Sequence, residues 1–219
     1  QQPQCLGRHR GLPVRNHSPE VGWLNMPPPL TDRISLQLPE WLDPFIADFN
    51  ATLDSVEARM ALAVALSREN LRQGTGGPFG AVVVAEEGNQ LLGAGVNLVT
   101  SAGLSVAHAE IVALSAAQAG IADWNLARAG PVQLITSCQP CAMCFGAVPW
   151  SGVSGLAWGA RKQDAEAAGF DEGDKPEDWE DSLRRRGIEV HGEVLREDAA
   201  AVLEHYSCTD GTIYHPRTS

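Results

Sequence analysis

Two short motifs in the sequence combine residue types that bind metal ions and move protons. The first is His108-Ala109-Glu110, and the second is Pro140-Cys141-Ala142-Met143-Cys144. Each motif is expected at the start of a helix, where the free backbone N–H groups favour a thiolate over a thiol. Cysteines three residues apart on a helix share one face, so Cys141 and Cys144 can bind one ion. Together with His108 they form a predicted zinc site.

This ligand set is typical of a catalytic metal site. Three protein ligands leave the fourth tetrahedral position of zinc open, and zinc lowers the pKa of a water there to about 7. Glu110, two residues after the histidine, can take a proton from that water. It can then pass the proton to a ring nitrogen and finally to a departing amine. The combination of H-x-E with P-C-x-x-C is typical of zinc-dependent deaminases that act on nucleobases.

Three other interpretations of these letters remain open at this point. Cys138 could complete a closed structural zinc site with the same three ligands, which would leave Glu110 without a role. Cys141 and Cys144 could instead form a redox dithiol, because C-x-x-C at a helix start has that chemistry. His191-Gly192-Glu193 repeats the H-x-E letters in an alternating strand pattern with no cysteine pair downstream. We interpret this repeat as coincidental.

The composition favours a small uncharged substrate. The 219 residues include 16 basic and 27 acidic side chains, for a net charge of −11. Because nucleic-acid binding depends on basic clusters that displace counterions, this charge disfavours a polynucleotide. Three of the five cysteines fall within seven residues, which suits metal binding better than a disulfide scaffold. The sequence shows no apolar run typical of a signal peptide or membrane span, so we expect a cytoplasmic protein.

The order of predicted elements indicates an α/β fold. Residues 1–30 are Pro-rich and are predicted to be a flexible tail, followed by a single deaminase domain over residues 31–219. Strands are expected over residues 81–85, 90–99, 132–136, 153–158 and 188–195, the first two as a hairpin. Helices are expected over residues 55–73, 108–118, 161–168, 176–186 and 197–206, with one more opening at Pro140. This alternation predicts a mixed sheet covered by helices on both faces.

Longer stretches around the motifs resemble the cytidine-deaminase-like superfamily, and within it the bacterial guanine deaminases. The resemblance covers about residues 55–215 and includes AHAEIVALSAAQ, TSCQPCAMCFGAVPWSGV, GGPFGAVVV, GAGVNLV and AGFDEGDKPEDW. It is strongest for a branch that also accepts the triazine ammeline. The resemblance implies a three-layer α/β/α fold with a five-stranded mixed sheet, one zinc per subunit and a homodimer. It also implies attack at C2 of guanine, which gives xanthine and ammonia.

The resemblance also assigns roles to individual residues. His108, Cys141 and Cys144 match the zinc ligands, and Glu110 matches the proton shuttle. Asn97 matches an asparagine that hydrogen-bonds the base, and Glu172 matches a second carboxylate that we predict to be catalytic. The other predicted substrate contacts are Phe79, Phe170, Trp150 and His108. Since the C-terminal segment covers the active site in some members of this superfamily, Tyr206 and Tyr214 are further candidates.

Several functions stay open beside guanine deamination. The substrate could be ammeline, guanosine, cytosine or another small aminated heterocycle. A tRNA adenosine deaminase would use the same zinc site, but the net charge of −11 argues against it. A zinc-stabilised protein without activity is disfavoured by the intact Glu110. We therefore expect a nucleobase or triazine as the substrate, and neither nucleic acid nor a membrane as a partner.

Overall fold

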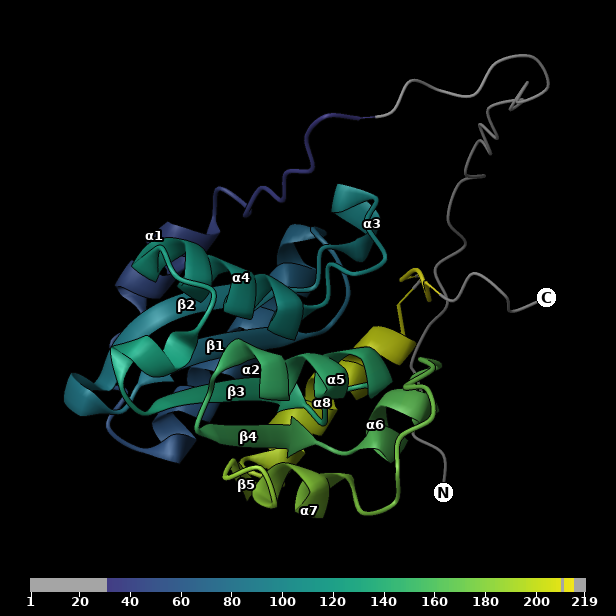
Figure 1. Cartoon of the computed structure of the whole chain (residues 1–219). Helices are drawn as coiled ribbons and strands as arrows, with labels where there is room; N and C mark the ends of the chain where they lie inside the picture. Colours follow the sequence, from purple (N-terminus) through teal and green to yellow (C-terminus); the bar gives the residue numbers. More distant parts are fainter. Residues whose placement is uncertain (1–30, 210, 215–219) are drawn as a thin grey trace. The chain divides into compact units, whose positions relative to one another are not determined.

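Five strands in the part of the chain that the structure describes form one sheet (Figure 1). The computed structural model describes residues 31–209 and 211–214, so the predicted tail over residues 1–30 lies outside them. By its contacts the chain divides into Gln1–Ser35 and Leu36–Ser219, and the second unit contains the sheet. The strands are β1 (Gly80–Ala85), β2 (Gln90–Val96), β3 (Val132–Cys138), β4 (Gly155–Ala160) and β5 (Glu189–His191).

The strand order and directions confirm the predicted mixed sheet. The order is β2-β1-β3-β4-β5. β1 pairs antiparallel with β2 and with β3, whereas β3, β4 and β5 run parallel. Gly88 and Asn89 turn the β1–β2 hairpin with positive φ values of 73° and 54°, which glycine and asparagine adopt more readily than other residues.

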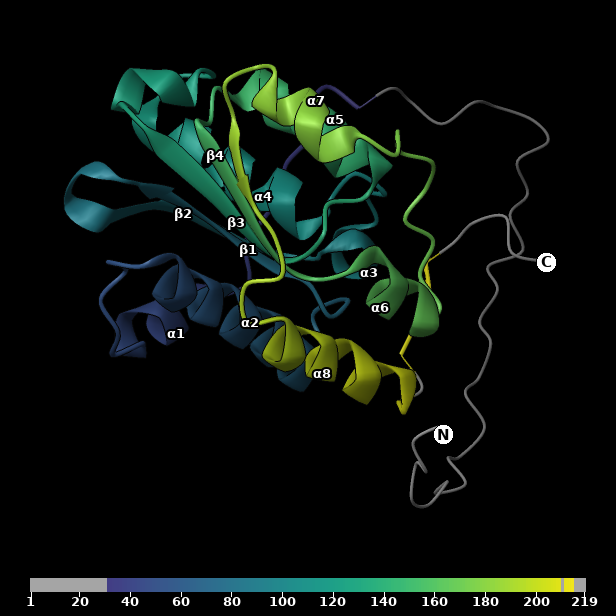
Figure 2. The same cartoon turned by 90° about the horizontal axis from the view of Figure 1, so that it is seen from below.

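Helices cover both faces of the sheet and complete the predicted α/β/α layers. Figure 2 shows α2 and α8 on one face and α4, α5 and α7 on the other. No helix in the described ranges is both long and apolar enough to cross a membrane. The α-helices are α1 (Leu42–Asp48), α2 (Val56–Gln73), α3 (Val99–Ala102), α4 (Ala109–Ile121), α5 (Ala142–Ser151), α6 (Lys162–Ala167), α7 (Trp179–Arg184) and α8 (Arg196–Ser207), with short 3-10 helices at Glu87–Asn89 and Leu126–Ala129.

The apolar core lies on both sides of β1. Successive side chains of a strand point to opposite faces. Accordingly, Val82 packs in one cluster with Met60 of α2, and Val83 packs in the other with Leu114 of α4. All six residues of β1 are buried. This explains why the run GAVVVA is apolar throughout instead of alternating.

The structure corrects the lengths of two predicted strands. β2 ends at Val96 instead of residue 99, because Val99–Ala102 forms the short helix α3. β5 covers only Glu189–His191 instead of residues 188–195. Its backbone turns away after Gly192, since Glu193 and Leu195 have φ values of 61° and 48°. α7 is also shorter than predicted, and α1 and α3 were not predicted at all.

One edge of the sheet brings the predicted site residues together. β1 starts where β2 ends, because the antiparallel register pairs Gly80 with Val96. Phe79 and Asn97 therefore flank this edge, and the backbone N–H of Asn97 donates to the Phe79 carbonyl. Cys138, the last residue of β3, lies near the same edge, since Ala81 pairs with Thr136. The chain then enters α5, so that the edge of the sheet and the start of a helix adjoin.

Candidate metal centre and cavity

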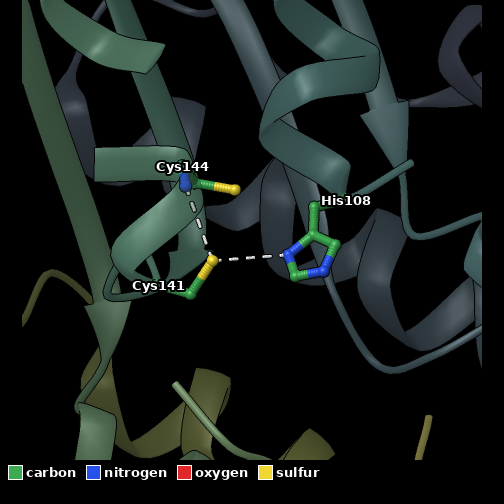
Figure 3. Close-up of side chains that lie close together, drawn as sticks. All are labelled: His108, Cys141 and Cys144. Atoms are coloured by element: carbon green, nitrogen blue, oxygen red, sulfur yellow. Dashed lines mark hydrogen bonds between the residues drawn. The ribbon is translucent and has the colours of Figure 1, made fainter. Parts of the chain in front are cut away.

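Three side chains from the starts of α4 and α5 form a compact metal-binding group. His108 is the N-cap of α4, Cys141 is the N-cap of α5, and Cys144 lies in the first turn of α5. Their ligand atoms all lie within 4.8 Å of one another. Figure 3 shows the Cys141 sulfur facing Nδ1 of His108. The two atoms lie 3.5 Å apart. α5 begins two residues later than predicted, at Ala142 instead of Pro140, so Cys141 caps it by accepting a bond from the Cys144 backbone amide.

The spacing of these atoms fits a tetrahedral metal ion. Zinc–sulfur and zinc–nitrogen bonds of about 2.3 and 2.0–2.1 Å place neighbouring ligand atoms roughly 3.5 Å apart, close to the distance between Cys141 and His108. Cys138 does not belong to this group, because its thiol is directed to the carbonyl of Arg161 at 3.8 Å. The closed structural site with Cys138 as fourth ligand therefore has no support in the geometry.

The surroundings of Cys141 favour its ionised form. A hydrogen bond from the Cys144 thiol, followed by the contact with His108, lowers the pKa of Cys141 to about 4, although burial opposes this shift. A thiolate is the form that binds a metal. A low thiol pKa also suits redox chemistry, but the histidine within 3.5 Å favours the metal site.

Two carboxylates are buried beside the metal-binding group. Glu110, in the first turn of α4, and Glu172, in the loop after α6, are each only 6% exposed. Burial, with the nearby Cys141 charge, raises the pKa of Glu110. The same two causes, together with Glu110, raise the pKa of Glu172 to about 8. Carboxyl groups shifted toward neutral pH are suited to proton transfer.

These groups line a narrow cavity of about 30 Å³. This volume is about that of one water, far below the roughly 300–1,000 Å³ of open ligand pockets. The lining brings together most of the substrate contacts expected from the sequence, and Cys144 adjoins it. The lining residues are Phe79, Asn97, His108, Glu110, Cys138, Gln139, Cys141, Phe170, Asp171, Glu172 and Tyr214.

Trp150 is the predicted contact that the structure does not bring to the cavity. It lies near the end of α5 and is 82% exposed. Nine residues separate it from Cys141, and this corresponds to about 13 Å along a helix. The expectation that Trp150 forms a pocket wall therefore fails for reasons of helix geometry.

Tyr214 fills the side of the cavity where a ring would meet Asn97. The Asn97 amide donates a hydrogen bond to the Tyr214 hydroxyl at 2.7 Å. The Tyr214 ring lies 5.4 Å from that of Phe170, between ring centroids. On its other sides Phe170 contacts Phe79 at 4.9 Å and stacks on Tyr206 at 5.5 Å. Of the two tyrosine candidates, Tyr214 enters the cavity and Tyr206 supports Phe170 from behind.

Gln139 and Lys175 lie near the cavity and were not predicted from the sequence. Gln139 lines it, and its side-chain oxygen accepts a bond from the Lys162 amide at 3.1 Å. Lys175 is half-buried, and its ammonium group donates to the carbonyl of Pro140, next to a predicted metal ligand. A lysine within the acidic stretch DEGDKPED was the available signal for the second residue.

A histidine and two cysteines beside buried glutamates, at the edge of an α/β/α sheet, define a metal-dependent deaminase. The comparison with known families agrees: the model of the cytidine and deoxycytidylate deaminase zinc-binding region matches residues 53–160. The chain belongs to this family of cytidine-deaminase-like enzymes, and it is a hydrolase.

Guanine deaminases and a tRNA deaminase are among its relatives. Guanine deaminase of Bacillus subtilis (strain 168) is 37% identical over 116 residues, which cover 53% of this chain and 71% of that protein. The solved structure of guanine deaminase from Nitrosomonas europaea is 42% identical with a TM-score of 0.75, over 83% of this chain and 100% of that one. A tRNA-specific adenosine deaminase of Buchnera aphidicola subsp. Schizaphis graminum is 30% identical over 129 residues, 59% of this chain and 79% of that protein.

Proposed function

We propose that this protein is a zinc-dependent hydrolytic deaminase that converts guanine and water to xanthine and ammonia. The observation that carries the proposal is the buried Glu110 beside the group of His108, Cys141 and Cys144, in a chain 42% identical to a guanine deaminase over 83% of its length. This donor set of one imidazole and two thiolates is one that zinc prefers. When bound, zinc supplies the nucleophile by lowering the pKa of a water to about 7.

The protein's own groups then move the protons and hold the ring. Glu110 accepts the proton that the water loses, delivers it to a ring nitrogen as C2 is attacked, and assists the departure of the amine. Glu172, on the loop, binds a ring N–H or the departing amine. Asn97 donates to the ring from the position where its amide now meets Tyr214. Phe170 covers a ring face, and its exclusion of water strengthens each of these polar contacts.

A free base fits the cavity better than a tRNA does. The cavity volume is about 30 Å³, and displacement of the single side chain of Tyr214 would add a space of about the size of one aromatic ring. The net charge of −11 gives a polynucleotide little attraction, since phosphate binding depends on clustered lysine and arginine. The similarity to a tRNA deaminase is therefore explained by shared chemistry around the metal site.

The protein is also proposed to be a homodimer, paired through the surface of α4 and α5. Trp150 and Trp124 are 82% and 74% exposed, and Met143 of α5 is 37% exposed. Exposed apolar side chains of this size are typical of interfaces. Trp150→Lys should convert a dimer to a monomer in light-scattering analysis, and a monomeric wild type would refute the pairing. A cytoplasmic location stays a prediction from the sequence.

An ammonia-release screen of the purified, zinc-loaded protein tests the function. The substrates are guanine, guanosine, ammeline, cytosine, cytidine and adenine, with chelator-treated protein and Glu110→Gln as controls. Guanine should be turned over fastest, and both controls should be nearly inactive. Faster turnover of cytosine or cytidine than of any purine would refute guanine as substrate and retain the deaminase chemistry. Activity that survives removal of zinc would refute the mechanism itself.

A further inference from the structure

Lys175 connects the loop that carries Glu172 to the helix that carries the two cysteines. Its ammonium group donates a hydrogen bond to the carbonyl of Pro140, the residue before Cys141. The same group lies 4.6 Å from the centre of the Trp179 ring, within the range of a cation–π contact. Its position is therefore fixed from two sides.

The loop makes further attachments around Glu172. The backbone carbonyl of Glu172 accepts a bond from the Ala142 amide at 2.9 Å, at the first residue of α5. On the other side of the loop, Lys162 donates to the carbonyl of Gly173 at 3.1 Å. Gly173 has a φ of 67°, and a Cβ there would come within 3.0 Å of the Ala142 side chain. The loop thus lies directly against the start of α5.

Lys175 also places a half-buried ammonium group near the Glu172 carboxyl group. Burial lowers the pKa of Lys175, while Glu172, Cys138 and Cys141 oppose this shift. In turn, Lys175 partly offsets the rise in the pKa of Glu172 that burial causes. The hydrogen bond from the Lys175 ammonium group to the Pro140 carbonyl is charge-assisted, which makes it stronger than a neutral one.

We propose that Lys175 is a positioning residue, which fastens this loop to α5 and thereby holds the Glu172 carboxylate in the cavity. The inference rests on the proposed function, because it assigns Glu172 to the deamination of the ring. Lys175 itself does not line the cavity, so it acts through Glu172. A positioning role differs from a purely structural one in one measurable respect. The effect of replacing Lys175 on kcat must disappear when Glu172 itself has been replaced.

The kinetic test compares Lys175→Met, Lys175→Arg and Lys162→Met. Methionine loses the bond to Pro140 and the ring contact, whereas arginine keeps both. Lys162→Met is the matched control, because it releases the same loop from α6 and leaves the contacts with α5. Lys175→Met should lower kcat at least about tenfold with KM within about threefold. Lys175→Arg should recover most of this loss, and Lys162→Met should cost less than about threefold.

A double-mutant cycle separates positioning from general damage. In a Glu172→Gln background, Lys175→Met should lower kcat less than about twofold, because residues that act as one unit are not additive. Zinc content and Tm should match the parent protein in each variant. Additive losses, or failure of Lys175→Arg to recover activity, would overturn the proposal. Lys175→Gln replaces Lys175→Met in the cycle where the methionine variant does not fold.

Hydrogen exchange tests the fastening without any assumption about the substrate. Lys175→Met should speed amide exchange in a peptide covering residues 170–176 at least about tenfold, because the loop then opens more often. Lys175→Arg should stay near wild type, and exchange in β1 should not change. Unchanged exchange in Lys175→Met would overturn the proposal. If the variants show these exchange rates but the wild type releases no ammonia from guanine, only the proposed function is refuted.

Discussion

Tyr214→Phe should raise the affinity for guanine, because it weakens the contact that closes the cavity. The Asn97 amide donates to the Tyr214 hydroxyl at 2.7 Å, and the Tyr214 ring packs 5.4 Å from Phe170. Phenylalanine keeps the ring contact and loses only the hydroxyl. A hydrogen bond contributes about 0.5–1.5 kcal/mol net. A loss of about 1 kcal/mol changes an equilibrium roughly fivefold.

A weaker contact between Tyr214 and Asn97 lowers the apparent Kd for guanine. In the proposed binding mode, guanine competes with Tyr214 for Asn97, so its apparent Kd is the intrinsic Kd divided by the open fraction. Where the closed form dominates, a roughly fivefold weaker closure raises the open fraction by about the same factor. Tyr214→Phe should therefore bind guanine about five times more tightly, with kcat close to that of the parent enzyme.

The assay is calorimetric titration of guanine into Glu110→Gln protein with and without Tyr214→Phe, so that slow turnover leaves binding measurable. The matched control is Tyr206→Phe, which removes the other tyrosine hydroxyl from its 2.8 Å bond to the Thr212 carbonyl. An equal gain in guanine affinity from both substitutions would show that the effect comes from general loosening of the C-terminal segment. Unchanged or weaker binding by Tyr214→Phe would refute competition at Asn97.

Three further predictions concern the metal and the two carboxylates. Cys144→Ala should release the metal, whereas Cys138→Ala should retain about one zinc per chain by metal analysis; loss in both would indicate a four-ligand structural site. Glu110→Gln should retain zinc and slow turnover by at least roughly 10²–10⁴, and activity within a few-fold of wild type would exclude it as the proton shuttle. Glu172→Gln should lower kcat/KM at least about tenfold at constant zinc content and Tm. Asp171→Asn should be much milder, because an asparagine oxygen can still accept the 2.8 Å bond from the Gly173 amide. If kcat/KM is unchanged in both variants, the loop has no role in catalysis and only connects two helices.

The part of the site that sequence predicts best is the part fixed by local geometry. The spacing of Cys141 and Cys144 on one helix already brings two ligands to one ion. The turn from β3 into α5 places both cysteines at the edge of the sheet, and His108 lies beside them at the start of α4. The mixed sheet followed equally from local patterns, since each strand is a short apolar run between turn residues.

The part that sequence predicts poorly depends on contacts between distant segments. β5 ends where Gly192 lies against the Trp158 ring, so close that a Cβ there would come within 2.4 Å of the ring atoms. Lys175 acquires its role only because α5 passes next to its loop. Tyr214 reaches Asn97 across 117 residues of chain. None of these contacts follows from a periodic or spaced pattern, although the lysine in DEGDKPED was an available signal and the resemblance pointed to Tyr214 in the C-terminal segment.

The same division separates chemistry from substrate choice. The metal ligands and Glu110 lie on two helix starts that the sheet holds in place, so they form the rigid side of the cavity. The opposite side is built from connecting segments, which carry Phe170, Glu172 and Tyr214. Loops tolerate change far better than packed helices. A family with one deamination chemistry and many substrates can therefore vary the loop side alone, and we expect these three side chains, together with Asn97, to decide which ring this protein accepts.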